Sequence, residues 1–362
     1  MESILLFVIG IAVLVFSAEK LIGYLVGVAS RWTISLFLVA VIFTGIEFDD
    51  LAFGIVLNLE DLSNVALGTV IGTTVAMTGV VLAISAIVAP CTIEVPRSYL
   101  ALFVVAPVVM LGFALTGFLT VAAGIVLVLL FVAFVAFVAY REYVARRPVF
   151  RNAEFYEQVE KVGAGVGGGG GAVALDEGPA AEPGGRSFTL PPDLRIDQGF
   201  LKARAHSPGL GLGLAVLALV GLVIGAVAAG QATEGVIETL GIDGTVFGVT
   251  IATLALSLED IFLTAEPQRR GAPEIAVANV IGSVVFSVTG KLGIILLAGG
   301  AIAVDADVLA WHLPVLIVMT AIAAGFMATG RLRRWHGVVL LALYVAYFVV
   351  SLVAFGGVPM DD

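Results

Sequence analysis

Cysteine, histidine and charged residues are all scarce in this sequence of 362 residues. Its single cysteine, Cys91, excludes an intrachain disulfide and any metal site with several cysteine ligands. The three histidines, His206, His312 and His336, are scattered and do not form the closely spaced pairs that hold zinc. Only 13% of the residues are charged, against roughly 25% in soluble proteins. The chain therefore has too few charges to cover a water-soluble fold, and no resident cofactor is expected.

Hydrophobic residues make up 60% of the sequence, and the mean hydropathy is +1.11. A bilayer core about 30 Å thick requires about 20 apolar residues per helix. Ten segments meet this requirement: 3–28, 33–57, 65–89, 98–116, 118–143, 208–231, 244–265, 273–300, 308–329 and 335–356. The predicted fold class is an all-α integral membrane protein with ten transmembrane helices, and the lipid bilayer is its expected environment.

One long polar segment, residues 144–207, interrupts this apolar pattern. It contains a glycine-rich run at 163–171, followed by Asp, Glu, Pro and Gly without periodicity, which is typical of a flexible linker. The segment separates five predicted spans from five others. The expected organisation is a first five-helix unit at 1–143, a flexible loop at 144–207 and a second five-helix unit at 208–362.

The basic residues indicate how these spans are oriented. If the ten spans alternate, all loops containing Lys or Arg fall on one face of the membrane, and the opposite loops contain none. The positive-inside rule then places the loop 144–207 in the cytoplasm and both termini outside the cell membrane. The net charge of −10 argues against nucleic acid as a partner, because phosphate binding requires clustered basic residues.

The two halves contain a repeated sequence. Residues 44–84 align without gaps with residues 254–294, so that Asp50 matches Asp260 and Val70-Ile71-Gly72 matches Val280-Ile281-Gly282. Because five spans separate equivalent positions, the second copy is expected to be inverted in the membrane relative to the first. Inverted repeats with polar residues inside their spans are typical of secondary transporters, which bind substrate near the midplane.

Acidic residues lie inside both copies of the repeat. The five carboxylates are Glu47, Asp49, Asp50, Glu259 and Asp260. Each costs about 2.5–3.5 kcal/mol at the centre of a membrane helix, so we expect them to pair, to face water or to bind a cation. Glu47 and Asp50 share one helix face at i, i+3 spacing, as do Ser257 and Asp260. The alternative is that Asp260 lies in water at the cytoplasmic end of its span.

Neutral oxygens and one lysine accompany these carboxylates. Thr73 and Ser283 follow equivalent glycines and are candidate ligands, although Ser and Thr also serve in ordinary helix packing. Lys291 falls near the level of Asp50, where its ammonium could supply positive charge that a second cation would otherwise bring. The predicted cation-binding residues are Glu47, Asp50, Thr73, Ser257, Asp260 and Ser283, with Glu47, Asp50 and Asp260 as the metal-binding carboxylates. The accessory candidates are Asp49, Glu259, Thr74 and Lys291.

These motifs resemble those of the cation/calcium exchanger superfamily, which includes the sodium/calcium exchangers. The resemblance is carried by SAEKLIGYLVGVASRWTISLFLVAVIFTGIEFDD (17–50), VFGVTIATLALSLED (246–260) and PEIAVANVIGSVVFS (273–287). In that family each repeat reads G-T-S-x-P-E and then G-N-x-x-G-S-[ND], and the two glutamates are the central cation ligands. The resemblance implies that Asp50 and Asp260 take the place of these glutamates.

Several positions depart from the family pattern in both copies. The proline before each central acid is replaced by Asp49 and Glu259, so the resemblance does not predict the helix break that the proline would cause. The serine of the first motif becomes Glu47 in one copy and Ser257 in the other. The Asn or Asp that ends the second motif becomes Thr74 and Val284. Extra carboxylates and a lysine thus replace neutral ligands.

The sequence as a whole predicts a secondary-active antiporter, not an enzyme, that exchanges calcium or another cation for sodium or protons. Calcium requires six to eight oxygen ligands, which the predicted residues and backbone carbonyls could approach. One alternative is a transport-inactive, cation-sensing or structural membrane protein that retains the exchanger fold. An intramembrane aspartyl protease is a further alternative, but the G-x-G-D pattern is absent around Asp260.

Overall fold

The computed structural model describes residues 2–29, 46–141, 208–269 and 273–355. The predicted loop 144–207 lies outside these ranges. The first half of the chain contains α1 (Glu2–Ala29), α3 (Phe48–Leu59), α4 (Ser63–Ala76), the π-helical segment η1 (Met77–Val81), α5 (Leu82–Val88), β1 (Cys91–Thr92), α6 (Arg97–Ala114), β2 (Phe118–Leu119) and α7 (Val121–Ala139). The second half contains α9 (Pro208–Leu240), α10 (Gly244–Phe247), η4 (Gly248–Ala252), α11 (Thr253–Arg269), α12 (Pro273–Phe286), η5 (Ser287–Lys291), α13 (Leu292–Gly299), β3 (Ile302–Ala303), η6 (Val308–His312), α14 (Leu313–Ala328), β4 (Arg331–Leu332) and α15 (Arg334–Phe355).

Seven of the described helices are long and apolar enough to cross a membrane. They are Ser63–Val88, Arg97–Ala114, Val121–Ala139, Gly213–Leu240, Ala276–Gly299, Val308–Ala328 and Arg334–Phe355. Each overlaps a predicted span, although Gly213–Leu240 extends beyond the predicted end at residue 231. Two shorter apolar helices, Glu2–Ser17 and Gly244–Ser257, fall in two further predicted spans. Of the predicted span 33–57, the described part is helical only from Phe48 onward.

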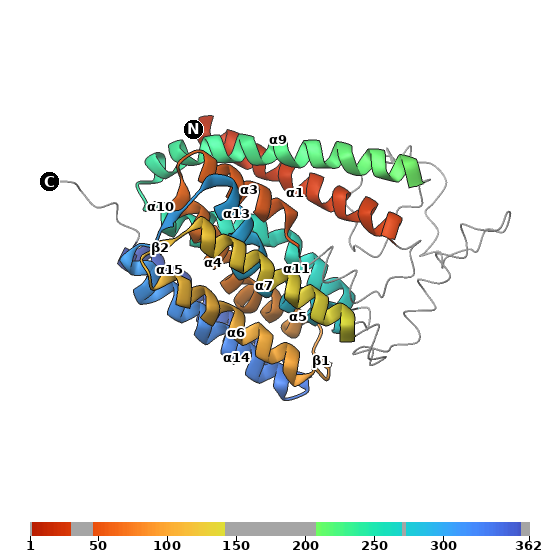
Figure 1. Cartoon of the computed structure of the whole chain (residues 1–362). Coiled ribbons are helices and arrows are strands. Elements are labelled where there is room, and N and C mark those ends of the chain that lie inside the picture. The colour runs from red at the N-terminus through yellow and green to blue at the C-terminus, as the bar shows by residue number, and fades with distance from the viewer. Residues whose placement is uncertain (1, 30–45, 142–207, 270–272, 356–362) are drawn as a thin grey trace, which may run out of the picture.

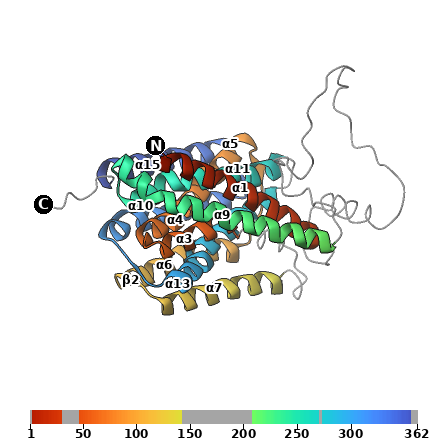
Figure 2. The ribbon, with the colours of Figure 1, turned by 90° about the horizontal axis from the view of Figure 1, so that it is seen from above.

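Two of the long helices form the centre of the molecule. These are Ser63–Val88, which joins α4, η1 and α5, and Ala276–Gly299, which runs from α12 through η5 into α13. In each, 89% of the most apolar stretch is buried, against 44% or less in the other five helices. Helix α7 packs against η5 and α13, and α15 packs against η1 and α5; Figure 2 shows α7 and α15 on opposite sides. Polar side chains on the central helices are therefore shielded from the surroundings.

Two short antiparallel ladders link the halves of the chain. β1 pairs with β4, with Cys91 opposite Leu332, and β2 pairs with β3, with Phe118 opposite Ala303. Because β1 precedes α6 and β2 follows it, the two ladders lie at opposite ends of that helix (Figure 1). The strands β1 and β3 each follow a central helix, yet they lie at opposite ends of the molecule. This is the relation that an inverted repeat produces.

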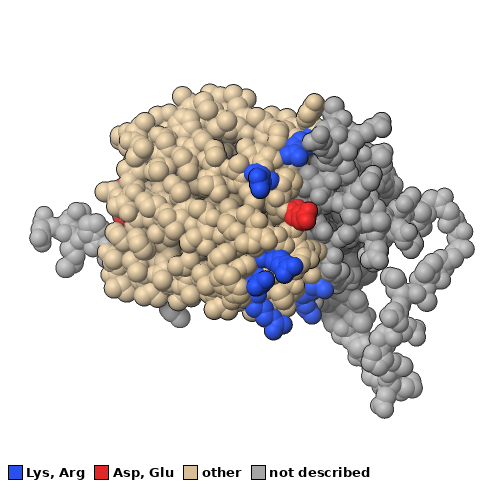
Figure 3. All heavy atoms as spheres, turned by 90° about the horizontal axis from the view of Figure 1, so that it is seen from below, with Lys and Arg blue, Asp and Glu red and all other residues tan. Residues whose placement is uncertain are grey.

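Charge is divided between these two ends. Arg97 begins α6 next to β1, while Arg331 and Arg334 lie in and after β4. Figure 3 shows Lys and Arg side chains gathered towards one end of the face in view, with a broad uncharged surface beside them. At the opposite end, Asp305 follows β3 and accepts a hydrogen bond from the Thr245 hydroxyl at 3.4 Å. An apolar belt between charged ends is typical of a bilayer-spanning protein.

The acidic end should respond to pH. Burial raises the pKa of Asp305 above the ordinary value of 3.8, and the charges of Asp307 and Asp243 raise it further. A raised carboxyl pKa gives stability that is fully present below the ordinary value and is lost as the pH rises through the raised one. We therefore expect Asp305→Asn to raise the Tm by a few degrees at most at pH 7. The gain over the unsubstituted protein should shrink as thermal unfolding is measured at pH values approaching 4, and a gain independent of pH would contradict this assignment.

Corresponding elements in the two halves share local details. The π-helical segments η1 and η5 occupy equivalent positions 210 residues apart, as do Asn58 and Gln268. The Asn58 amide donates to the carbonyls of Ile295 and Gly300 at 3.1 and 3.4 Å. The Gln268 amide likewise donates to the carbonyls of Ser85, at 3.3 Å, and Ala89. In each half, an amide side chain thus binds carbonyl groups at the end of the central helix of the other half. The repeat seen in the sequence therefore extends to side-chain contacts.

Glycines let the central helix α4 approach α10 and η4 closely. A Cβ placed on Gly248 would lie 2.6 Å from the carbonyl oxygen of Val65 and 2.9 Å from the amide nitrogen of Thr69. Both contacts are with backbone atoms, which cannot move aside. We therefore expect Gly248→Ala to destabilise the protein by about 1–3 kcal/mol, measured by thermal unfolding in detergent. Gly112 of α6, where a Cβ would meet nothing within 4 Å, is the matched control. Gly112→Ala should leave the Tm unchanged or raise it, and equal losses in both variants would show that the close approach is not the cause.

Candidate functional site

Helix α3 begins at the first predicted acidic cluster. Glu47 is its N-cap and has a non-helical backbone (φ −72°, ψ 83°), and its carbonyl accepts the first helical hydrogen bond from Leu51 at 2.9 Å. Asp49 and Asp50 lie in the first turn, where the helix dipole favours negative charge. A helix therefore begins directly after Glu47 although the family's proline is missing. In the second copy, α11 continues without a break through Ser257.

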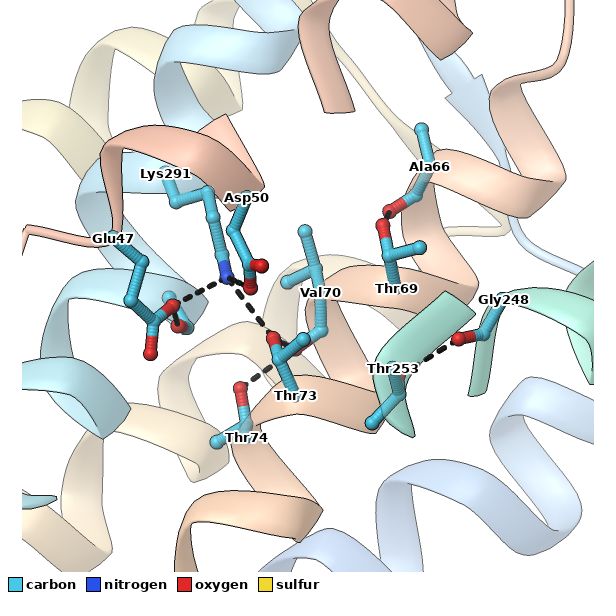
Figure 4. Close-up of polar contacts among 11 residues, drawn as sticks. Glu47, Asp50, Ala66, Thr69, Val70, Thr73, Thr74, Gly248, Thr253 and Lys291 are labelled. Atoms are coloured by element: carbon cyan, nitrogen blue, oxygen red, sulfur yellow. Dashed lines mark hydrogen bonds and ion pairs between the residues drawn. The ribbon is translucent and has the colours of Figure 1, made fainter. Parts of the chain in front are cut away.

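Lys291 connects residues of both halves at this point. Its ammonium lies 2.6 Å from Glu47 Oε2 and 2.7 Å from Asp50 Oδ2, and it donates to the Thr73 hydroxyl at 3.0 Å (Figure 4). Lys291 is 1% exposed, Glu47 4% and Asp50 5%. Charges removed from water to this extent are stable only when they are paired and hydrogen-bonded. The structure thus brings together four of the predicted residues, with the lysine as the counter-ion.

The lysine belongs to a polar stripe along the second central helix. Asn279, Ser283, Ser287 and Lys291 follow one another at intervals of four residues, and all are buried. Ser287 donates to Glu47 Oε2 at 2.7 Å. Ser287 and Asn279 were not among the predicted site residues, although their four-residue spacing from Ser283 and Lys291 indicates a shared helix face.

Two buried oxygen atoms on this stripe and one on Glu47 lack a hydrogen-bond partner within the described residues. Ser283 Oγ, Asn279 Oδ1 and Glu47 Oε1 are each buried without a hydrogen-bond partner in the described part of the molecule. Most buried polar atoms in proteins are hydrogen-bonded, so each unpaired oxygen requires an explanation. Oxygen atoms of these kinds are the ligands that hard cations prefer.

The same stripe faces the second acidic segment. Ser257, Asp260 and Thr264 of α11 lie on one helix face at i, i+3 and i+7, and all three are buried. The Asn279 amide donates to the Thr264 hydroxyl at 3.0 Å, so this face of α11 is turned towards α12. Asp260 and Ser283 are therefore on facing sides of two packed helices, as their counterparts Asp50 and Thr73 are on α3 and α4.

The remaining predicted residues have other surroundings. Asp49 is buried in the first turn of α3. The Thr74 hydroxyl donates to the carbonyl of Val70 in its own helix at 2.6 Å (Figure 4). Its hydrogen-bond donor is therefore already satisfied within the helix. The side chain of Glu259 lies outside the described residues. Among the side chains that are described, no three His, Cys, Asp or Glu residues are grouped as a preformed metal centre, so the metal-binding role of Glu47, Asp50 and Asp260 stays a prediction.

The sequence of this chain is similar to a known protein family and to curated relatives. A family model described as sodium/calcium exchanger protein matches residues 2–140 and 210–353. The sodium/calcium exchanger MaX1 of Methanosarcina acetivorans is 35% identical over 139 residues, which cover 37% of this chain and 39% of MaX1. The membrane protein MJ0091 of Methanocaldococcus jannaschii is 27% identical over 139 residues, which cover 36% of this chain and 42% of the relative. The chain thus spans less than half the length of these curated relatives.

Solved structures with a similar fold cover nearly the whole chain. Structures of the sodium-calcium exchanger NCX_Mj, soaked with Na⁺ and Sr²⁺ or with zero Na⁺ and Ca²⁺, match with TM-scores of 0.58 and 0.55. The first match covers 96% of this chain and 97% of NCX_Mj at 16% identity, and the second covers 97% and 98% at 18% identity. At this level of identity the similarity shows the fold.

Proposed function

Because the chain belongs to the sodium/calcium exchanger protein family, we propose that it is a secondary-active antiporter that exchanges calcium or another inorganic cation for sodium or protons. The family match confirms the resemblance found in the sequence motifs, and with the apolar helices it shows a multi-pass membrane protein. The proposed topology has ten spans in two inverted units, with both termini outside and residues 144–207 in the cytoplasm. The opposite placement of β1 and β3 and the charge difference between the two ends support it.

The unpaired oxygens on the polar stripe carry the proposed cation site. Ser283 Oγ and Asn279 Oδ1 are buried without partners on α12, and Asp260 is buried on the facing side of α11. A carboxylate next to unsatisfied neutral oxygens has the composition of a site for a hard cation. A cation bound there would satisfy the Ser283 and Asn279 oxygens, with the Asp260 carboxylate as its charged ligand. Ser257 on the same face of α11 and Glu47 Oε1 are further candidate ligands.

The chemistry of exchange follows from competition for one cluster. A carboxylate in an apolar bundle is tolerated when it is neutralised by a cation or by a proton. Two different cations can therefore replace one another at the same oxygens but cannot be bound there together. If the two inverted units rock against each other around this cluster, the site opens first to one side of the membrane and then to the other. Release of one cation on one side of the membrane therefore frees the ligand oxygens for the competing cation.

Ion-resolved exchange in vesicles tests this function. The purified chain is reconstituted into liposomes, and uptake of radioactive calcium or sodium is followed while opposing calcium, sodium and proton gradients are imposed in turn. We expect uptake with at least one cation pair and none without an opposing gradient. The transport-inactive alternative requires no gradient-driven uptake with any pair, together with retention of a cation-dependent Tm. No uptake and no cation effect on the Tm would contradict the antiporter and the cation-sensing alternative alike, and would favour the purely structural one.

A further inference from the structure

We propose that the side-chain amides of Asn58 and Gln268 hold closed two routes, one at each end of the molecule, by which cations reach the central carboxylates. This inference rests on the proposed function, because such routes serve a chain that exchanges cations between two sides of a membrane. Both are positioning residues, which act on the contact between two helices and are not proposed as cation ligands. These equivalent positions each lie eight residues, or about 12 Å along a helix, after Asp50 and Asp260.

The contact between α3 and α13 extends from the carboxylates to the acidic end of the molecule. Asp50, Gly54 and Asn58 follow one another at four-residue intervals, and the Asp50 carboxylate binds the lysine that ends η5. One turn further, a Cβ placed on Gly54 would lie 2.5 Å from Ile295 Cδ1. The Asn58 amide then donates to the carbonyls of Ile295 and Gly300 at 3.1 and 3.4 Å. A cation can move along this acidic-end contact only if the two helices separate.

The contact between α11 and α5 repeats this arrangement at the basic end, where α6 begins. The Gln268 amide donates to the carbonyl of Ser85 at 3.3 Å and to that of Ala89, the C-cap of α5. One turn closer to Asp260, the Thr264 carbonyl accepts a hydrogen bond from the Ser85 hydroxyl at 3.5 Å. In each contact, an amide from one half therefore fixes the end of the central helix of the other half.

Neutral amides suit a contact that opens and closes in every exchange cycle. Asn58 and Gln268 are both 5% exposed, and the C-cap carbonyls that they bind have no partner within their own helix. When a contact opens, water can replace both the donor and the acceptor. Each such hydrogen bond therefore changes the equilibrium between closed and open forms only about 2- to 10-fold. The contact is closed by several of these bonds and still opens readily.

Reaction of buried thiols measures the opening of each contact separately. Ile295 and Ser85 are equivalent, fully buried positions, so Ile295→Cys and Ser85→Cys place one reporter thiol in each contact. All variants also carry Cys91→Ser, because Cys91 is the single cysteine of the sequence. The reaction rate with a water-soluble maleimide is measured on the purified full chain in detergent. Each reporter is then combined with Asn58→Leu or Gln268→Met, which keep the approximate side-chain size and remove the amide.

The two amide variants should act at opposite ends. We expect Asn58→Leu to accelerate labelling at position 295 on the order of 10-fold and to leave labelling at position 85 unchanged or slower, because opening at one end accompanies closure at the other. Gln268→Met should do the reverse. Thr320→Val is the matched control, because it removes a buried hydroxyl that donates to the Leu316 carbonyl at 2.8 Å within α14. It should change neither rate.

The possible results separate this inference from the proposed function. Equal acceleration at both positions, or none at either, would show that the amides do not act on separate ends and would overturn the inference, even if liposomes show exchange. Labelling confined to the expected end, in a chain that exchanges no cation, would sustain the two contacts as separate closures and contradict the proposed function. Asn58→Ser and Gln268→Ser give the same comparison if the larger apolar side chains prevent folding.

Discussion

Asp260→Asn is expected to abolish cation exchange. Asparagine keeps the size of the side chain and one carbonyl oxygen, but it removes the negative charge that faces Ser283 and Asn279. Removing the charged partner of a buried ion costs about 3–5 kcal/mol, so exchange at subsaturating cation should fall on the order of 100-fold or more. The measurement is the initial rate of gradient-driven uptake into liposomes that contain equal amounts of folded protein.

Asp61→Asn is the matched control for the loss of a carboxylate. Asp61 is exposed in the turn between α3 and α4 and has a positive φ of 62°, a backbone conformation that asparagine tolerates well. Its replacement should leave the uptake rate unchanged. Full exchange by Asp260→Asn, at rates equal to those of Asp61→Asn, would eliminate the site proposed on α11 and α12.

Removing Lys291 alone should produce the largest loss of stability. In Lys291→Met, Glu47 and Asp50 are left in the bundle without their shared ammonium. Breaking a buried ion pair by deleting one partner costs about 3–5 kcal/mol, since the remaining charge is then uncompensated. We expect a correspondingly large decrease in the unfolding free energy in buffer free of metal cations, and partial recovery when sodium is added.

A charge-compensated variant distinguishes lost charge pairing from lost packing. The triple variant Glu47→Gln, Asp50→Asn, Lys291→Met removes both carboxylates together with the ammonium, so it leaves no uncompensated charge at these positions and should recover most of the stability lost in Lys291→Met. The difference in unfolding free energy between Lys291→Met and the triple variant measures how much of the loss comes from the two uncompensated carboxylates. If the triple variant is as unstable as Lys291→Met, the lysine acts through packing and not through its charge.

Much of this arrangement follows from residue spacing alone. The ungapped match of Asp50 with Asp260 predicts two equivalent acidic segments, and counting residues along the spans places Lys291 at the level of Asp50. Helical periodicity shows which residues share a face, as for Ser257 and Asp260. These inferences need only the pitch of a helix and the cost of burying a charge.

Other features of the site depend on how the helices pack against one another, which residue spacing does not reveal. Glu47 and Lys291 are 244 positions apart, and the choice of Glu47 Oε2 as the oxygen shared with Ser287 depends on how two helices from different halves cross. The start of a helix directly after Glu47 was not expected, because the family's proline is absent at position 49. Acidic side chains in the first turn, which favour a helix N-terminus, are a local signal for that start.

Locating the bound cation tests the central claim most directly. Crystals of the full chain are soaked with strontium, a divalent cation with strong anomalous scattering, and the anomalous difference density is calculated. We expect a peak between the Asp260 carboxylate and the Ser283 hydroxyl, with Lys291 still bound to Glu47 and Asp50. A peak between Glu47 and Asp50 with Lys291 displaced, and none beside Asp260, would contradict the account.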